Sequence, residues 1–239
     1  MLDNINPEEV LFLDIETVPQ QQGFELLDED MQQLWTDKSR FTRERNNITL
    51  EESYHSAGIY AEFGKVICIS AGYFADRLGD SIFRVTSFYG DDERALLHDF
   101  AEMLNNNTGH RFHLLCAHNG KEFDFPFLCR RMLIQGIRLP VLLDMAGKKP
   151  WEIAHLDTLE LWKFGDFKHY TSLRLLARIF GIPTPKDDID GSQVRQVYYE
   201  EKDVDRIEKY CKKDVITVAQ VFLRYRGAPL LSEDRIISV

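Results

Sequence analysis

The feature that most constrains this chain is a set of four acidic residues lying far apart in the sequence. Asp14 and Glu16 end one apolar run, Asp124 follows a second, and Asp214 lies in a segment with helical spacing. Carboxylates gathered into one site repel one another unless divalent metal ions neutralise them. If the fold brings the four residues together, they predict a metal site.

The first pair of acids follows a predicted buried strand. Residues 10–13 are all apolar, and a spacing of two places Asp14 and Glu16 on the same face of a strand, where they can share a metal ion. With 39 acidic residues in 239, this spacing also arises by chance. The pair alone would fit a solvated strand end equally well.

The third acid marks a predicted junction between a strand and a helix. Asp124 follows the apolar run 112–117 through a turn centred on Asn119 and Gly120, and it precedes Pro126, a residue favoured in the first turn of a helix. Taken alone, Asp124 would also fit a simple helix cap.

The fourth acid is paired with a tyrosine one helical turn earlier. Apolar residues recur around them at steps of three and four: Val204, Ile207, Cys211, Val215, Val218 and Phe222. This spacing predicts a helix with Tyr210 and Asp214 on one face. Alone, Asp214 would fit the solvated shoulder of an amphipathic helix.

Taken in order, these segments resemble the three motifs of the DEDD superfamily of 3′-to-5′ exonucleases. The stretches are DIET at 14–17, NGKEFD at 119–124 and YCKKD at 210–214. Tyrosine four residues before the last aspartate, with Lys209 where the other branch has histidine, indicates the tyrosine branch. The stretches 61–70, 155–164 and 186–194 resemble stand-alone bacterial exonucleases related to the proofreading domain of family B DNA polymerases.

The resemblance implies a fold and an activity. The expected fold is α/β, a ribonuclease H-like mixed sheet flanked by helices, in a single domain over 1–239 with its core at about 10–226. The expected activity is metal-dependent hydrolysis of nucleic acid from the 3′ end to nucleotide 5′-monophosphates.

The resemblance also assigns roles in a two-metal mechanism. Asp14 would bridge both ions, Glu16 and Asp214 would complete the ion that holds the attacking water, and Asp124 would hold the second ion. Tyr210 would orient the water, because a phenol with a pKa near 10 is a poor base at neutral pH. Ligation by oxygen alone favours two Mg²⁺ or Mn²⁺ ions over zinc.

Substrate contacts are implied beside the motifs. The family places Ile15, Thr17 and Asn119 at the terminal nucleotide, and Phe123 could stack on an unpaired base. Core packing is the competing interpretation for Ile15 and for at least two of Phe123, Phe125 and Phe127. Nearby cations could contact phosphates or form a solvated helix face: Lys121, Arg130, Arg131 and Arg138.

Charge bounds the substrate class. A net charge of −10 predicts weak, metal-dependent binding of nucleic acid and argues against a protein that coats it. We expect single-stranded DNA as the substrate and a replication or repair protein as a candidate partner. An RNA-trimming exonuclease and a catalytically idle interaction module of the same fold are the alternatives.

Cysteine usage and hydropathy indicate the compartment. The four cysteines form no CxxC pair and mostly fall in apolar runs, which is typical of reduced thiols in a cytoplasmic protein. No run approaches 18 apolar residues, and residues 1–10 lack the apolar core of a signal peptide. We therefore expect no membrane association.

Periodicity locates the remaining elements. Strands are predicted near 10–15, 65–74, 81–89 and 111–117, and helices near 91–104, 125–135, 171–180 and 203–225. A polar, partly helical insertion at 20–61 is expected to cover a sheet edge, with capping of the active site or binding of a partner as alternatives. Turn residues predict a loop over 183–191.

Overall fold

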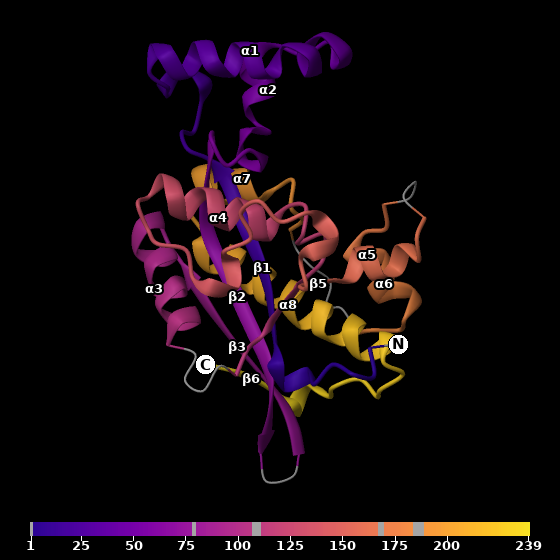
Figure 1. Ribbon diagram of the computed structural model, residues 1–239. Helices are drawn as coiled ribbons and strands as arrows, with labels where there is room; N and C mark the ends of the chain where they lie inside the picture. Colours follow the sequence, from indigo (N-terminus) through magenta and orange to yellow (C-terminus); the bar gives the residue numbers. More distant parts are fainter. Residues whose placement is uncertain (1, 78–79, 107–110, 167–169, 184–188) are drawn as a thin grey trace.

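A mixed sheet organises the fold. The computed structural model describes residues 2–77, 80–106, 111–166, 170–183 and 189–239 (Figure 1). Its sheet has the order β5-β4-β1-β2-β3-β6. The strands are β1 (Val10–Pro19), β2 (Gly64–Arg77), β3 (Asp80–Tyr89), β4 (Leu114–Ala117), β5 (Leu156–Asp157) and β6 (Ile236–Ser238). The antiparallel pairs β1–β2 and β2–β3 are flanked by parallel pairs at both edges, which confirms the predicted mixed α/β sheet.

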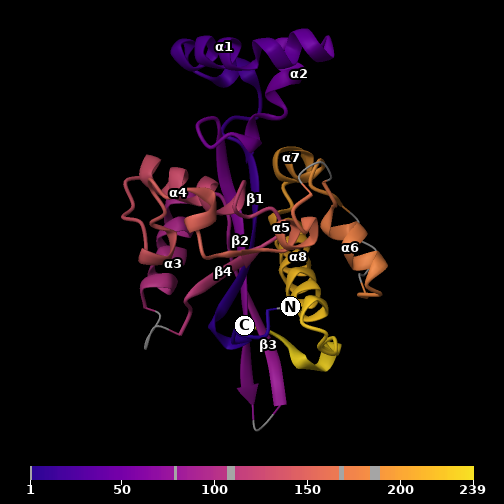
Figure 2. The same cartoon turned by 45° about the vertical axis from the view of Figure 1, so that its right-hand side comes forward.

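Helices cover both faces of this sheet. The helices are α1 (Glu29–Asn46), α2 (Leu50–Tyr54), α3 (Glu93–Asn105), α4 (Asp124–Ile134), α5 (Thr158–Lys163), α6 (Leu173–Ile179), α7 (Val194–Gln196) and α8 (Val204–Tyr225). Helices α3 and α4 lie on one face, and α5, α6 and α8 lie on the other (Figure 2). The four predicted helices correspond to α3, α4, α6 and α8. Most of the predicted 183–191 loop lies outside the described residues.

Strand β1 is buried on both faces because its two sets of alternating side chains join different cores. Leu11, Leu13 and Ile15 belong to the cluster beneath α3 and α4. Val10 and Phe12 belong to the cluster beneath α8. A strand that is covered on both faces has apolar residues at every position, which is why the run at 10–13 predicted a buried strand.

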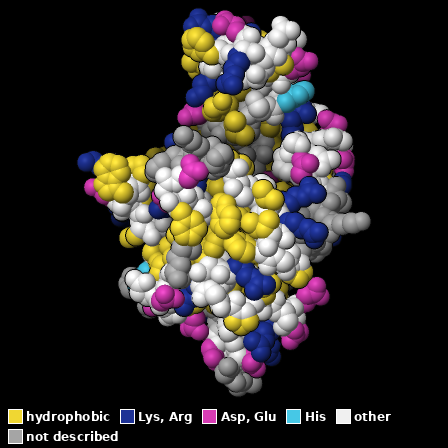
Figure 3. Space-filling view, turned by 90° about the vertical axis from the view of Figure 1, so that its right-hand side faces the viewer, with side chains coloured by type: hydrophobic (Ala, Val, Ile, Leu, Met, Phe, Trp, Pro, Cys, Tyr) yellow, Lys and Arg dark blue, Asp and Glu magenta, His cyan; other side chains and the backbone are white. Residues whose placement is uncertain are grey.

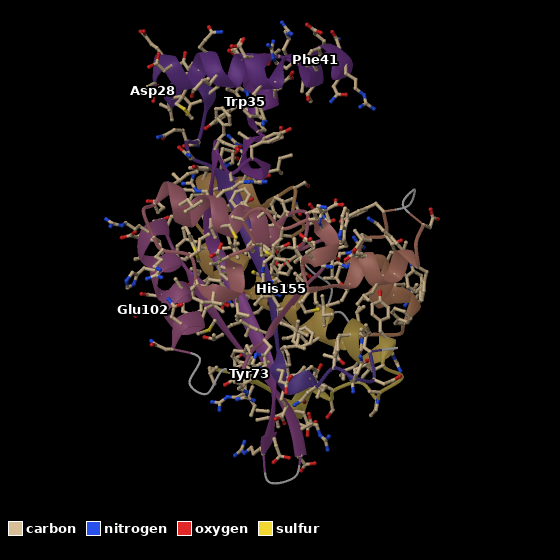
Figure 4. All side chains as sticks on the ribbon, viewed as in Figure 1. Asp28, Trp35, Phe41, Tyr73, Glu102 and His155 are labelled. Atoms are coloured by element: carbon tan, nitrogen blue, oxygen red, sulfur yellow. The ribbon has the colours of Figure 1, made fainter. Side chains whose placement is uncertain are left out.

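The insertion forms a helical projection and does not cover a sheet edge. Helices α1 and α2 stand beyond the ends of β1 and β2, whereas the edge strands are β5 and β6 (Figures 1 and 2). The expectation of edge coverage was therefore wrong for the outer strands β5 and β6, and the insertion meets the sheet where Gly58 lies against β1. The projection has its own core, in which Trp35 lies beneath α1 with its ring 5.5 Å from that of Tyr54 and 5.0 Å from that of Phe63 (Figure 4).

The segment around Gly58 and Ala61, where the projection joins the sheet, forms its root, and this root is bound to β1. The hydroxyl of Thr17 donates a hydrogen bond to the carbonyl of Gly58 at 2.8 Å. A Cβ atom added to Gly58 would lie only 2.9 Å from the backbone carbon of Val18, so only glycine allows this approach.

A buried ion pair joins the root to α3 and α4. Arg131 is only 3% exposed, so the prediction that it meets phosphates or solvent was wrong. Its Nε donates to Glu93 at 2.8 Å, and its Nη1 donates to the carbonyl of Ala61 at 2.8 Å. Glu93 also accepts the backbone N–H of Val66 at the start of β2.

We predict that Arg131→Met destabilises the protein by about 3–5 kcal/mol, because it leaves the Glu93 carboxylate buried without its cation. Urea denaturation would measure the loss. Arg235→Met is the matched control: Arg235 pairs with Asp80 on the surface, and its removal should cost about 0–1 kcal/mol. Similar losses in both variants would contradict the role given to burial.

Candidate active site

The acids of β1 face α8 because they continue an alternating set of side chains. Phe12 packs edge-on against Phe222 of α8, with ring centroids 5.2 Å apart. Two and four residues later the same face of β1 presents Asp14 and Glu16. The thiol of Cys211 on α8 donates to the backbone carbonyl of Asp14 at 3.3 Å, which fixes the helix against the strand at this level.

Three side chains from β1 and α8 form the tightest part of the site. The ligand atoms of Asp14, Glu16 and Cys211 all lie within 4.8 Å of one another. Glu16 is nearly buried, at 9% exposed, while Asp14 is partly buried. A register shift in the β1–β2 pairing falls immediately after Glu16. Such irregularities are frequent beside active sites because they redirect side chains.

Asp124 reaches the site from the first residue of α4. The pairing of β1 with β4 ends at Phe12, so the edge of β1 is open farther along. Asp124 uses this opening, and its Oδ1 accepts the backbone N–H of Ile15 at 3.2 Å. Its carboxylate therefore contacts the backbone between the two strand acids.

Electrostatic coupling links all four acids. The pKa of Asp14 is raised well above its usual value by burial and by repulsion from Asp214, Glu16 and Asp124. The pKa of Glu16 is likewise raised by burial and by its neighbours, led by Asp214. Burial raises the pKa of Asp124 to about 7, with contributions from Asp157 and Asp214. The structure thus brings the four predicted acids together.

Tyr210 lies on the α8 side of this cluster. Its pKa is raised by burial first and then by the charges of Asp214, Glu16 and Asp14, and its hydroxyl is hydrogen-bonded to Asp214. A phenol in these surroundings stays neutral and donates a hydrogen bond to the carboxylate. Its geometry suits orientation of a ligand better than removal of a proton.

The donor set fits hard divalent cations. Among the described residues, no lysine or arginine forms an ion pair with Asp14, Glu16 or Asp124. Burial raises the pKa of the Cys211 thiol well above its usual value, which keeps the sulfur neutral. The available charged ligands are carboxylate oxygens, the ligands that Mg²⁺ and Mn²⁺ prefer.

A further carboxylate, missed by the sequence analysis, holds the second motif in place. Asp157 is 3% exposed and caps α5. Its Oδ1 accepts the N–H of Asn119 at 2.9 Å, and its Oδ2 accepts that of Lys121 at 3.1 Å. Asn119 has φ = 65°, a left-handed conformation that asparagine tolerates. The sequence DTLE at 157–160 could have predicted this cap, because an N-cap aspartate followed three residues later by glutamate is typical of a helix start.

The predicted substrate contacts divide into two groups. The side chain of Ile15 is in the core, and the hydroxyl of Thr17 bonds to Gly58. Asn119 and Phe123 are partly exposed beside Asp124. Phe125 and Phe127 are buried, as expected for at least two of the three phenylalanines. Of the nearby cations, Lys121 pairs with Glu160 at 2.7 Å, while Arg130 and Arg138 are exposed.

The chain belongs to a family described as a predicted 3′-5′ exonuclease related to the exonuclease domain of PolB, whose model matches residues 59–231. This match includes Asp124, Tyr210 and Asp214 but begins after Asp14 and Glu16. The family indicates an exonuclease-like hydrolase, a class of enzyme that acts on nucleic acid.

Two similar proteins are DNA polymerases. The DNA polymerase of Pyrococcus glycovorans is 22% identical over 184 residues, which are 69% of this chain and 22% of the polymerase. The family B DNA polymerase of the archaeon Pyrobaculum calidifontis matches in structure with a TM-score of 0.55 and 15% identity, over 92% of this chain and 24% of the polymerase. The chain thus spans less than a quarter of either, and the structural match shows a shared fold. In the described residues, no helix has the length and apolar character needed to cross a bilayer.

We predict that the metal-free protein loses stability as the pH rises from about 5 to about 8. The acids Asp14, Glu16 and Asp124 have raised pKa values, so the folded state binds protons more tightly than the unfolded state. This contribution is complete below about pH 4 and is lost as the pH passes about 7.

Thermal unfolding in EDTA and in Mg²⁺ across this range would test the prediction. Bound Mg²⁺ should raise the Tm, and more so at the higher pH, where the carboxylates are ionised. Asp14→Asn should weaken both the pH dependence and the effect of Mg²⁺. A Tm that rises with pH in EDTA would contradict the repulsion described here.

Proposed function

We propose that the protein is a metal-dependent 3′-5′ exonuclease that acts on single-stranded DNA and releases nucleotide 5′-monophosphates. The observation that carries this proposal is the coupling of four carboxylates, from β1, α4 and α8, while no lysine or arginine among the described residues forms an ion pair with Asp14, Glu16 or Asp124. An idle binding module would gain nothing from such repulsion.

The acids divide into two ligand groups. Asp14 interacts with the other three acids and would help to hold both ions, with Glu16 and Asp214 completing one and Asp124 holding the second. Two such ions would supply an activated water and stabilise the leaving oxygen. The same arrangement has no need of a histidine, and none is assigned a catalytic role.

Tyr210 would hold the attacking water by its hydroxyl. The water oxygen forms a bond to phosphorus, the bond from phosphorus to the 3′ oxygen breaks, and that oxygen leaves with a proton. Because the phenol stays neutral beside Asp214, it fixes the direction of attack without accepting the proton.

Substrate selection would begin at the second motif. Asn119 and Phe123 are the predicted contact residues that remain partly exposed beside Asp124, and they would meet the terminal nucleotide. The net charge of −10 favours a substrate held by few nucleotides and by bound metal ions over one held along a long basic surface.

We predict that Asp14→Asn and Asp214→Asn each lower hydrolysis by roughly 10³-fold or more, because metal ligation contributes several kcal/mol to the transition state. Release of mononucleotides from a 3′-labelled DNA oligomer in Mg²⁺ measures this. The Tm of the metal-free variants should be unchanged or higher, since repulsion is relieved. Full turnover in either variant would remove the basis of the proposal.

Tyr210→Phe should slow the reaction by about 10- to 100-fold, less than loss of an acid, because the metal ligands remain. The same release assay measures the change. Tyr73→Phe is the matched control and should keep full activity, because Tyr73 (labelled in Figure 4) packs against the cluster of Leu11 and Leu13, on the face of β1 opposite to Asp14 and Glu16. If Tyr210→Phe lowered activity as much as Asp14→Asn does, the Tyr210 phenol would do more than orient water.

DNA and RNA oligomers of identical sequence, degraded side by side, would decide the substrate. We expect faster degradation of DNA at equal enzyme concentration. Equal or faster degradation of RNA would favour the RNA-trimming alternative, in which 2′-hydroxyl groups are accommodated. Labels at opposite ends of the oligomer would establish the direction of digestion.

A further inference from the structure

Two tyrosines interact electrostatically with different acids of the cluster. Tyr210 interacts with Asp214, Glu16 and Asp14. Tyr170 interacts instead with Asp124 and Asp157, and it is 69% exposed. The proposed mechanism uses Tyr210 but gives Tyr170 no role.

The chemistry assigns different parts of the substrate to these two groups of acids, if the proposed function holds. In an in-line displacement the attacking water and the leaving oxygen lie on opposite sides of phosphorus. The water lies beside Tyr210, so the leaving 3′ oxygen lies toward Asp124. That oxygen belongs to the strand that remains after cleavage. Tyr170 is an exposed aromatic residue that interacts with Asp124, so it is a candidate contact for this strand.

The ring of Tyr170 is supported by a fixed neighbour. It lies edge-on to His118, with centroids 6.4 Å apart. The Nε2 of His118 donates to the carbonyl of Thr171 at 2.9 Å, so its Nδ1 is left to accept the hydroxyl of Thr158 at 2.9 Å. Burial lowers the pKa of His118, which keeps this neutral tautomer. With both ring nitrogens bonded, His118 forms a rigid support beside the second motif.

The surface beyond Tyr170 continues over α5 and α6. Phe164 ends α5 in a left-handed conformation, φ = 45°, with its ring 76% exposed. This backbone state is unusual for a bulky residue and is often associated with ligand contact. Leu175 and Ile179 are about half exposed one turn apart on α6. Figure 3 shows hydrophobic side chains gathered on this face, with lysine and arginine side chains beside them.

Helix α6 also carries two exposed cations, which are four residues apart, as Leu175 and Ile179 are. Arg174 directly precedes Leu175 in the sequence, and Arg178 directly precedes Ile179. We call the six residues Phe164, Tyr170, Arg174, Leu175, Arg178 and Ile179 the α5–α6 platform. Exposed aromatic rings and guanidinium groups are the features that bind single strands without reading their sequence.

We propose that the α5–α6 platform holds the retained part of the single-stranded substrate, with bases stacked on Tyr170 and Phe164 and phosphates near Arg174 and Arg178. A protein partner would also fit an apolar surface. Nucleic acid is favoured because the platform starts at the acid cluster and its charge is opposite to that of a strand, in a chain that is acidic overall.

Binding without turnover tests this inference. All variants are made in the Asp14→Asn background, and fluorescence anisotropy follows the binding of a labelled single-stranded DNA oligomer. We expect Tyr170→Ala to raise Kd by about 5- to 100-fold, as loss of one stacked base does, while Tyr170→Phe binds like the parent. Trp151→Ala is the control, because Trp151 is also exposed, at 78%, but lies outside the platform.

Two further measurements separate this role from a general loss of structure. Arg178→Ala should lower the slope of log Kd against log salt by about 0.7–1, as expected for one phosphate contact. In the same background, the Tm of Tyr170→Ala should equal that of the parent, because Tyr170 is largely exposed and an exposed side chain contributes little to the fold.

The outcomes distinguish this inference from the proposed function. If the unmodified enzyme hydrolyses DNA but Tyr170→Ala binds the oligomer as tightly as the parent, the platform is wrong and the exonuclease stands. If the Asp14→Asn parent binds no oligomer and the unmodified enzyme hydrolyses none, both are overturned. If Trp151→Ala raised Kd as much as Tyr170→Ala does, the role given to the platform would also be overturned.

Discussion

Repulsion among buried carboxylates is the constraint on which the rest of the structure depends. The acids do not hold themselves together, so other contacts must do so. Packing of Phe12 on Phe222 sets α8 along β1, and the thiol of Cys211 fixes its level at Asp14. The N–H of Ile15 holds Asp124. The site is therefore preorganised by apolar packing and backbone hydrogen bonds, and its unbalanced charge is available to bind cations.

The sequence was informative where a side-chain pattern follows from one element. Alternation along β1 placed Asp14 and Glu16 together, and helical spacing placed Tyr210 with Asp214. Prediction failed where structure depends on distant partners. Strand β5 has two residues and exists because β4 lies beside it, so it leaves no periodic signal. Arg131 resembles a surface cation in sequence and is buried only because Glu93 arrives from α3.

The family match and the structure are complementary. The match covers 59–231 and so contains only half of the acid cluster. The structure supplies the other half, because β1 lies at the centre of the sheet between β4 and β2. The resemblance to polymerases is confined to less than a quarter of those chains, and the projection formed by α1 and α2 stands apart from the sheet that carries the acids.

The close approach of Gly58 to Val18 has a consequence for how relatives of this protein can diverge. Any larger residue at this position would push against Val18 in the strand that carries Asp14 and Glu16, so position 58 is closed to substitution. Among the described residues, α1 packs against the small core of the projection, and its exposed residues carry no such restriction. Changing the size or charge of these exposed residues would leave the catalytic geometry intact, which makes this surface the part of the molecule most free to acquire new binding partners.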